Sequence, residues 1–408
     1  MAGAIAGSLV LAGCVTQTTY ERAPVAGVKT ESLARTLSDA GFAIFKAGGD
    51  DANLAVSPVS IGVAFGMLKA GATGPVDAAL DEVFHYPASG QELLKQFNAL
   101  DLATSSEAGD GAKNAKGDTV DLPIVTIANR AFIDKGFDVR ADYLESIHSY
   151  FGADAVAAPL STDAVASRAL IDGWVKEQTR GLVPKIMPED QPTPDSRLVL
   201  VNATYLKAQW NTPFDASLTN DGEFHLADGS TTTAKFMWGT LETPYVNGDD
   251  FVSATLPYVG DLEMVVVVPK DGAFDDVQSR LSQSFLDDLD AAKATGLVAV
   301  QLPKFDVQSK VNLRDTIENG LGVTGLFDVE GLDGIAPKLL VDSAVHATHV
   351  IVDEDGTEAG AATALDVAAS GMPLYDAELH ADRPFLYVIR NPETGAVLFV
   401  GRYTDPSA

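Results

Sequence analysis

Residues 198–207 read LVLVNATYLK, and this β-rich run is the stretch that most strongly indicates the fold. Two further β-rich runs follow, at residues 262–268 and 397–400. Helical patterns near 163–180 and 274–292 alternate with these runs, and no repeat of 20 to 50 residues and no Pro/Gly-rich linker separates them. The sequence therefore predicts a mixed α+β chain without an obvious domain boundary.

The N-terminal part of the chain predicts two helices. Apolar residues recur there at helical spacing, at Leu33, Leu37, Ala40 and Ile44. Gly48 and Gly49 end this pattern. A second helix is expected after Ser57, because a serine cap followed by proline is a common helix start. Residues 103–121 are rich in Gly, Asp, Ala and Lys, which indicates a flexible insertion.

The composition is that of a globular protein with a strongly acidic surface. Hydrophobic residues make up 46% of the 408 residues and charged residues 21%, so the chain can bury a sizeable core. The 57 acidic and 28 basic side chains give a formal charge of −29. A field of this sign repels nucleic-acid phosphates and anionic lipid surfaces, so we expect no nucleic-acid partner.

The N-terminus resembles the signal peptide of a bacterial lipoprotein. A short apolar run within residues 1–14 is too short to span a bilayer and ends in Leu11-Ala12-Gly13-Cys14, which resembles a lipobox. On this interpretation Cys14 is lipidated, residues 15–28 form a polar tether, and the protein is exported. It is then a membrane-anchored lipoprotein that faces the periplasm or the cell exterior, and the lipid is its sole membrane contact. No Lys or Arg precedes Arg22, which departs from the pattern, and a plain secretory signal or a chance cysteine remains an alternative.

Segments spread over residues 30–406 resemble motifs of the serpin family. Residues 53–61 (NLAVSPVSI) resemble the start of the family's second helix, and residues 198–207 with Trp210 resemble its long central strand. The remaining matches are LPKF at 302–305, His346, residues 354–362, ADRPF at 381–385 and LFVGR at 398–402. The resemblance implies an α+β fold of about nine helices around three β-sheets, formed by residues 29–408, with an exposed reactive-centre loop at about 354–383.

The resemblance also implies a function, which is suicide inhibition of serine or cysteine proteases. The target protease attacks the loop and forms its acyl intermediate, and the cleaved loop then inserts into the main sheet as a new strand and deforms the enzyme. We therefore expect no catalytic residues, no cofactor and no metal, and a monomeric protein. The rival interpretation is a non-inhibitory serpin that acts as a surface binding or chaperone-like protein.

The hinge of the loop has the side chains that insertion requires. The resemblance assigns to it Glu354, Gly356, Thr357, Glu358, Ala359, Gly360, Ala361, Ala362 and Thr363. In a strand every second side chain points into the core, so alternate positions must be small and uncharged. The expected inward residues meet this condition and are Thr357, Ala359, Ala361 and Thr363. Gly360 replaces the alanine that the family prefers, on the outward face, at a cost of roughly 0.5–1 kcal/mol in a strand.

Further residues resemble positions that control the opening of the sheet. Glu354 and Lys304 correspond to an ion pair where the sheet first opens, beside Trp210. A hydrogen-bonded cluster beneath the sheet's centre corresponds to Ser57, Ser60, Asn202 and His346. Without the resemblance these residues have ordinary interpretations, as a solvated ion pair, a helix cap, a buried amide and a core histidine.

The scissile bond is predicted at Ser370-Gly371 from the spacing to the hinge. Counting back from residues 383–385 points to a site about three residues later. Cleavage after Met372 would put Pro373 on the leaving side, which most serine proteases reject because proline lacks an amide hydrogen. Leu374-Tyr375 remains an alternative. The small residues before Gly371 favour a protease with a small or apolar pocket, elastase-like or subtilisin-like.

Enzyme and metal interpretations find no support in the sequence. Gly-x-Ser-x-Gly, Ser-x-x-Lys and His-Glu-x-x-His do not occur. His346 and His349 lie three residues apart on an expected strand, so they point to opposite faces and make a poor metal pair. The Asp353-x-Asp355-Gly356 fragment lacks the first and twelfth ligands of a calcium loop.

Overall fold

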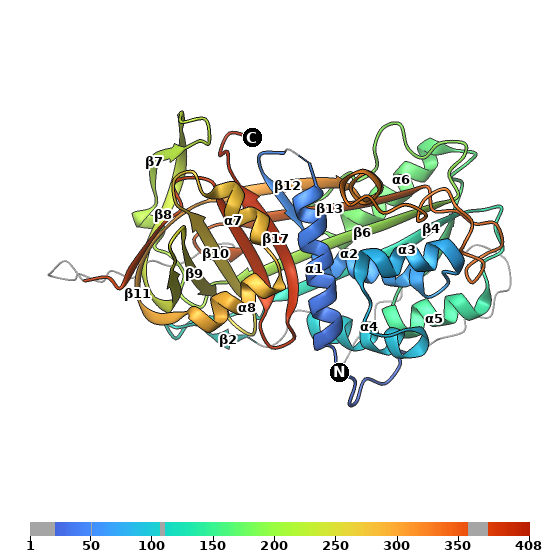
Figure 1. Ribbon diagram of the computed structural model, residues 1–408, viewed down its shortest axis with the longest axis horizontal. Coiled ribbons are helices and arrows are strands. Elements are labelled where there is room, and N and C mark those ends of the chain that lie inside the picture. Colours follow the sequence, from blue (N-terminus) through green and yellow to red (C-terminus); the bar gives the residue numbers. More distant parts are fainter. Residues whose placement is uncertain (1–20, 50, 107–110, 358–373) are drawn as a thin grey trace.

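The computed structural model describes residues 21–49, 51–106, 111–357 and 374–408. In these residues the chain forms nine α-helical segments and three β-sheets, which confirms the predicted α+β fold (Figure 1). The β-rich runs at 198–207, 262–268 and 397–400 are all strands. None of the helices in these ranges has the length and apolar character that crossing a bilayer requires.

A six-stranded sheet carries the functional part of the molecule. Its order is β12-β13-β14-β6-β4-β5. The strands are β12 (Phe305–Asn312), β13 (Ser343–Val352), β14 (Gly356–Thr357), β6 (Leu198–Gln209), β4 (Ile124–Asp134) and β5 (Asp154–Ala158). Strands β4, β6, β12 and β13 have 8 to 12 residues, whereas β5 has five and β14 two. Strand β6 is buried along nearly its whole length.

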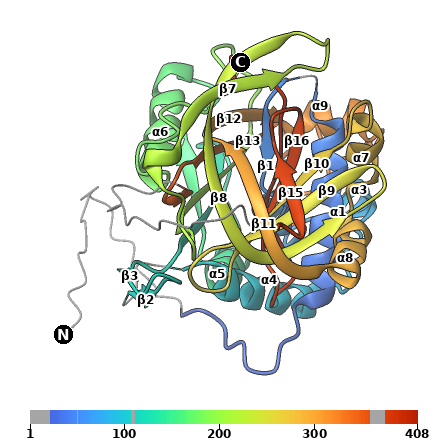
Figure 2. The same cartoon turned by 90° about the vertical axis from the view of Figure 1, so that its left-hand side faces the viewer.

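A nine-stranded sheet packs beside it, in the order β1-β17-β16-β10-β9-β8-β11-β15, with β7 paired to β8. Its strands are β1 (Leu54–Val56), β17 (Ala396–Tyr403), β16 (Phe385–Asn391), β10 (Glu263–Pro269), β9 (Phe251–Pro257), β8 (Thr231–Asn247), β11 (Ala294–Pro303), β15 (Ala377–His380) and β7 (Asn220–His225). Figure 2 shows β8, β11 and β15 side by side, with β15 at the edge of this sheet. A two-stranded hairpin, β2 (Ala112–Lys113) and β3 (Thr119–Val120), lies within the expected insertion at 103–121.

The helices cover the sheets and bury one large core. They are α1 (Glu31–Ala47), α2 (Pro58–Lys69), α3 (Gly74–Phe84), α4 (Gly90–Thr104), α5 (Ala141–Phe151), α6 (Ala164–Gln178), α7 (Phe274–Arg280), α8 (Gln283–Ala292) and α9 (Leu313–Asp315), with a 3₁₀ turn at Ala216–Leu218 and a π turn at Thr316–Gly320. Helix α2 is buried almost all round between β6, β17 and α1, so it is apolar on every side. Helix α6 lies on the opposite face of the six-stranded sheet and encloses a second, smaller core.

The two N-terminal helices form where the sequence predicts them, but one predicted cap is absent. Helix α1 buries Leu33, Leu37 and Ile44 on one face and ends before Gly48. Helix α2 begins at Pro58, yet the Ser57 hydroxyl makes no capping hydrogen bond. Proline at the first helical position already fixes a helical φ, which favours the start of α2 at Pro58 without a side-chain cap.

The last part of the expected tether contacts the folded body. The Arg22 guanidinium donates hydrogen bonds to the side chains of Asn98 and Asp101 on α4, each at 2.8 Å. The next residue, Ala23, donates its amide hydrogen to the Ser149 carbonyl on α5 at 2.9 Å. Because Asn98 and Asp101 are buried polar groups that need partners, this docking satisfies them. The predicted tether therefore reaches the body by Arg22 instead of ending at residue 28.

The predicted loop also differs at its ends from the range 354–383. Gly356 and Thr357 form β14 in the six-stranded sheet, and Ala377–His380 form β15, which pairs with β11 in the other sheet. Both ends of the range form backbone hydrogen bonds, β14 with β13 and β6 and β15 with β11, because buried backbone groups need such partners. The connection between the two sheets is therefore limited to residues 358–376.

Candidate functional site

A fork between β13 and β6 forms the centre of the candidate site. These parallel strands pair from Ser343–Val199 up to Thr348–Thr204. Beyond this point they separate, and β14 lies between them, paired with Val352 on one side and with Ala208 and Gln209 on the other. The two strands are therefore joined directly as far as Thr348 and Thr204, and beyond these residues an additional strand can lie between them.

Gly356 is the residue that lets β14 enter the fork. Its φ of 153° is one that residues with a Cβ rarely adopt, and a Cβ there would lie 2.1 Å from the Ala208 carbonyl oxygen. Glycine alone therefore allows the backbone to approach β6 this closely.

Thr357 follows with its side chain in the core, 1% exposed, as the alternation predicts. Its hydroxyl forms a hydrogen bond of 2.6 Å with the Tyr258 hydroxyl. Burial raises the pKa of Tyr258, so its hydroxyl stays neutral and available for this bond. The first inward position of the hinge is thus small, uncharged and hydrogen-bonded.

Glu354 and Lys304 form an ion pair immediately above the fork. Lys304 Nζ donates to Glu354 Oε2 at 2.5 Å, and the Thr219 hydroxyl donates to Glu354 Oε1 at 2.7 Å. Burial of Glu354 opposes ionisation, but these two hydrogen bonds outweigh it and hold the pKa of this carboxyl below its usual value. The pair joins the turn after β13 to the start of β12. The sequence did not predict the contribution of Thr219.

Trp210 donates two hydrogen bonds to the same turn, which leads from β13 into β14. Its indole Nε1 donates to the Asp353 carbonyl at 2.9 Å, and its backbone amide donates to the Asp355 carbonyl at 2.8 Å. The indole stacks on the Tyr258 ring with centroids 4.3 Å apart. The turn from β13 into β14 is therefore fixed by one tryptophan that also contacts the partner of Thr357.

A buried hydrogen-bond cluster joins β13 and β6 below the fork. His346 Nδ1 contacts Asn202 Oδ1, and the Ser57 amide donates to His346 Nε2 at 2.9 Å. Burial lowers the pKa of His346 to about 3, so the ring is neutral at physiological pH, with its proton on Nδ1 and its lone pair facing Ser57. The structure thus brings the two strands together through one neutral imidazole.

The Asn202 side-chain amide completes this cluster. Its nitrogen donates to the Ser60 carbonyl at 2.7 Å, and it also contacts the Ser60 hydroxyl and Asn129 Oδ1. Asn129 lies on β4, directly opposite Asn202, and was not among the predicted residues because a single asparagine in a β-run carries no sequence signal. Ser57 acts through its backbone, since its buried hydroxyl has no hydrogen-bond partner within the described ranges.

Several predicted positions lie outside the described residues. These are Glu358, Ala359, Gly360, Ala361, Ala362, Thr363, Ser370, Gly371 and Cys14. Leu374, in the alternative scissile bond, lies within the described part of the chain and is 95% exposed.

His349 and His346 lie on opposite faces of the sheet, as their spacing predicts. His346 faces the large core under α2, whereas His349 faces the segment that follows α6. No group of three potential metal ligands occurs in the described residues.

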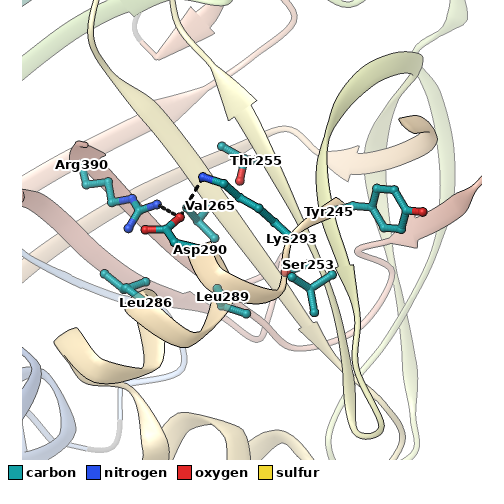
Figure 3. Close-up of a pocket in the computed structure, with 10 residues that line it drawn as sticks. Tyr245, Ser253, Thr255, Val265, Leu286, Leu289, Asp290, Lys293 and Arg390 are labelled. Carbon is teal, nitrogen blue, oxygen red and sulfur yellow. Dashed lines mark hydrogen bonds and ion pairs between the residues drawn. The ribbon is translucent and has the colours of Figure 1, made fainter. Parts of the chain in front are cut away.

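A hollow beside α8 is lined by charged side chains (Figure 3). Arg390 and Asp290 meet in it at 2.6 Å, and Lys293 contacts the same carboxylate at 3.0 Å. The remaining volume is about 10 Å³. This is room for about one water molecule, whereas ligand pockets usually measure about 300–1,000 Å³, so the hollow is filled by its own ion pairs.

Comparison with known proteins identifies the family. The model of the family described as serpin (serine protease inhibitor) matches residues 35–406. A serpin-like protein of Thermococcus kodakarensis is 31% identical and covers 88% of this chain and 82% of the relative. The leukocyte elastase inhibitor of Bos taurus is also 31% identical, covering 87% of this chain and 93% of the relative.

Solved structures agree with this match. The thermophilic serpin tengpin in its native state has a TM-score of 0.84 at 24% identity, over 95% of this chain and 98% of that one. Human thyroxine-binding globulin has a TM-score of 0.81 at 23% identity, over 92% and 99% of the two chains. With the fold, the fork and the family match in agreement, the chain belongs to the serpin family of serine protease inhibitors.

Proposed function

We propose that this serpin is a suicide-substrate inhibitor of serine endopeptidases that inserts its cleaved loop between β13 and β6. The observation that carries the proposal is β14 itself. Gly356 and Thr357 are already paired on both sides of the fork, with the Thr357 side chain buried. On this proposal, β14 supplies the first two residues of a strand that the cleaved loop would extend between β13 and β6.

Continuation in this register brings small side chains to the core. Two-residue alternation from Thr357 places Ala359, Ala361 and Thr363 inward and leaves Glu358 in solvent. About fifteen added strand residues, at a net 0.5–1.5 kcal/mol for each backbone hydrogen bond, release roughly 10 kcal/mol. The uninserted form is then metastable, and a kinetic barrier preserves it.

The contacts around the fork supply parts of that barrier. The Glu354–Lys304 pair and the Trp210 contacts hold the turn above the fork, and the His346–Asn202 contact ties β13 to β6 below it. Each must rearrange before a strand can enter. We assign these residues to the control of sheet opening on this ground.

The target is proposed to be a protease with a small or apolar specificity pocket, elastase-like or subtilisin-like. Residues 367–370 read VAAS, and these small, uncharged side chains before the Ser370-Gly371 bond favour such a pocket. Several relatives are named leukocyte elastase inhibitor, which supports the same class. Cleavage at Leu374-Tyr375 is the alternative, and the exposure of Leu374 is compatible with it.

The site of action is proposed to be outside the cytoplasm. The lipobox-like sequence ending at Cys14 supports a lipid-anchored or secreted monomer. Because the body docks at Arg22, an anchor at Cys14 would leave only seven intervening residues, numbers 15–21, which reach at most about 25 Å.

A test of the proposal incubates the full chain with elastase, subtilisin and chymotrypsin. Denaturing gels and mass spectrometry would detect an acyl complex and the released C-terminal peptide. A stable complex with a peptide that begins at Gly371 supports both the mechanism and the bond. Clean cleavage without a complex for every enzyme would favour the non-inhibitory alternative.

A further inference from the structure

A short segment after α6 bridges the two strands that must separate. We name residues Arg180–Leu182 the strap. At one end, the Arg180 guanidinium lies over the Tyr205 ring on β6, 4.9 Å from its centroid. At the other end, the Leu182 carbonyl lies 3.1 Å from His349 Nδ1 on β13. Tyr205 and His349 are the first residues beyond the last β13–β6 pair, so the strap spans the base of the fork.

The strap is held in place by its own chain. The Thr179 hydroxyl donates to the Val175 carbonyl at 2.8 Å and accepts the Val183 amide hydrogen at 3.0 Å. Arg180 and Gly181 then turn with φ angles of 51° and 92°, and Val183 is buried against the sheet. The Leu182 carbonyl therefore faces His349 because the chain on both sides of it is anchored.

Both ring nitrogens of His349 face hydrogen-bond acceptors. Nδ1 faces the Leu182 carbonyl, and Nε2 lies 2.5 Å from Asp306 Oδ1 on β12. A carbonyl and a carboxylate cannot donate, so both contacts form together only when both nitrogens carry protons. In the neutral ring, one of the two contacts is lost, and the Gln308 amide, 3.5 Å from Nε2, is the available replacement for Asp306.

If the pairing of β14 continued in the same register, an inserted strand would pass under the strap. Thr357 pairs with Val352 of β13 and with Ala208 of β6. Three residues further along such a strand, position 360 would therefore lie between His349 and Tyr205. In such a strand, position 360 would point outward, toward the face that the strap covers. An outward side chain would meet the strap there, whereas glycine has none, which gives a reason for glycine at this position.

From these contacts we propose that the strap is a pH-dependent restraint on loop insertion, tightened when His349 is protonated. The proposal rests on the proposed function, since it assumes insertion between β13 and β6. Protonated His349 donates a charge-assisted bond to the Leu182 carbonyl, and this bond exists only while the strap lies over the fork. Its other bond, to Asp306, joins β13 to β12 and does not involve the strap. Acidification through the range in which histidine gains its charge therefore slows insertion.

Charged groups on this face include Asp306 and Lys310 on β12, Lys207 on β6, Arg130 on β4 and Arg180 on the strap, and none of these is a histidine. His346, on the opposite face, has a pKa lowered by burial to about 3 and stays neutral.

The experiment measures uptake of a synthetic peptide by the intact full chain. The peptide has the sequence of residues 357–370, TEAGAATALDVAAS, and a fluorescent label. We expect uptake by the wild type to be about fivefold slower at pH 5.5 than at pH 8.0, because charged hydrogen bonds are stronger than neutral ones. In His349→Gln and in Asp306→Asn the rates at the two pH values should differ by less than about twofold. Asp306→Asn changes an exposed side chain, so folding is preserved even if the histidine variant fails.

His380→Gln is the matched control. His380 is a half-exposed histidine on β15, away from the strap, and its replacement should leave the fivefold ratio unchanged. Equal wild-type rates at the two pH values overturn the strap proposal alone, as does a ratio that survives both variants. No uptake at any pH, together with no gain in heat stability on loop cleavage, overturns the proposed insertion itself.

Discussion

Replacing Thr357 by arginine is predicted to convert this serpin from an inhibitor into a substrate. Thr357 is 1% exposed and bonded to the buried Tyr258 hydroxyl, at the edge of the large hydrophobic core. Insertion of the cleaved loop would carry the new charge into this core. The change therefore acts on the step that competes with hydrolysis of the acyl-enzyme.

The magnitude follows from the cost of a buried unpaired charge. Such a charge costs about 3–5 kcal/mol. Because each 1.4 kcal/mol on a barrier slows a step about tenfold, even a third of this cost at the transition state slows insertion by roughly tenfold. In the uncut protein the cost is smaller, about 1–3 kcal/mol, since the hinge can leave the fork and lose only β14 pairing and the Tyr258 bond.

The assay is a titration of a protease that the wild type inhibits, with gels to separate complex from cleaved serpin. Thr357→Arg should need at least about ten times more serpin per protease molecule inhibited and should give mostly cleaved product. Thr357→Val, which keeps the shape and loses only the hydroxyl, should inhibit nearly as the wild type does. An unchanged stoichiometry for Thr357→Arg would refute the reasoning that position 357 is buried during inhibition.

Three further predictions concern the contacts around the fork and the N-terminus. The pKa of Glu354 is lowered in the folded state, so this carboxylate stabilises the fold above its ordinary pKa of 4.5, and the stabilisation is lost as the pH falls below 4.5. Lys304→Ala should remove about 1 kcal/mol of this acid-sensitive stability, as measured by denaturant titration at pH 7. Asn202→Ala leaves buried polar partners unpaired and should lower the free energy of unfolding by about 1–3 kcal/mol and accelerate spontaneous loss of inhibitory activity. Burial raises the pKa of Asp101 even though Arg22 donates a hydrogen bond to it. Arg22→Ala removes this cation and should lower the free energy of unfolding by about 1–2 kcal/mol in thermal melts at neutral pH.

Each of these has an outcome that contradicts it. An unaltered acid limb of the stability curve in Lys304→Ala would show that the pair adds nothing to holding the turn. Wild-type persistence of activity in Asn202→Ala would remove the cluster from the barrier. For Arg22→Ala the control is Lys29→Ala, an exposed lysine near the same segment, and equal melting temperatures for both variants would show that the docking is not stabilising.

The sequence predicted the fold class and the family because those depend on long patterns. The run at 198–207 and the helical spacing from Leu33 to Ile44 are read directly from residue types. The ion pair of Glu354 with Lys304 was anticipated through the resemblance, which carries spatial information that spacing lacks.

What the sequence could not predict depends on contacts between distant segments. Nothing in residues 15–28 marks Arg22 as bound to α4, because its partners lie more than seventy positions away. The pairing of Thr357 inside the fork depends on Tyr258 and on the backbone of β6. The role of His349 depends on a carbonyl, which has no side-chain identity in the sequence.

The most direct test of the central claim is the heat stability of the protein before and after a single cut within residues 358–373. Insertion of the cut loop would release roughly 10 kcal/mol, so we expect the melting temperature to rise by more than about 10 °C. The measurement needs no knowledge of the natural target, since any protease that nicks the segment serves. A cut protein that melts at the temperature of the intact one, or below it, would contradict the claim that the loop inserts between β13 and β6.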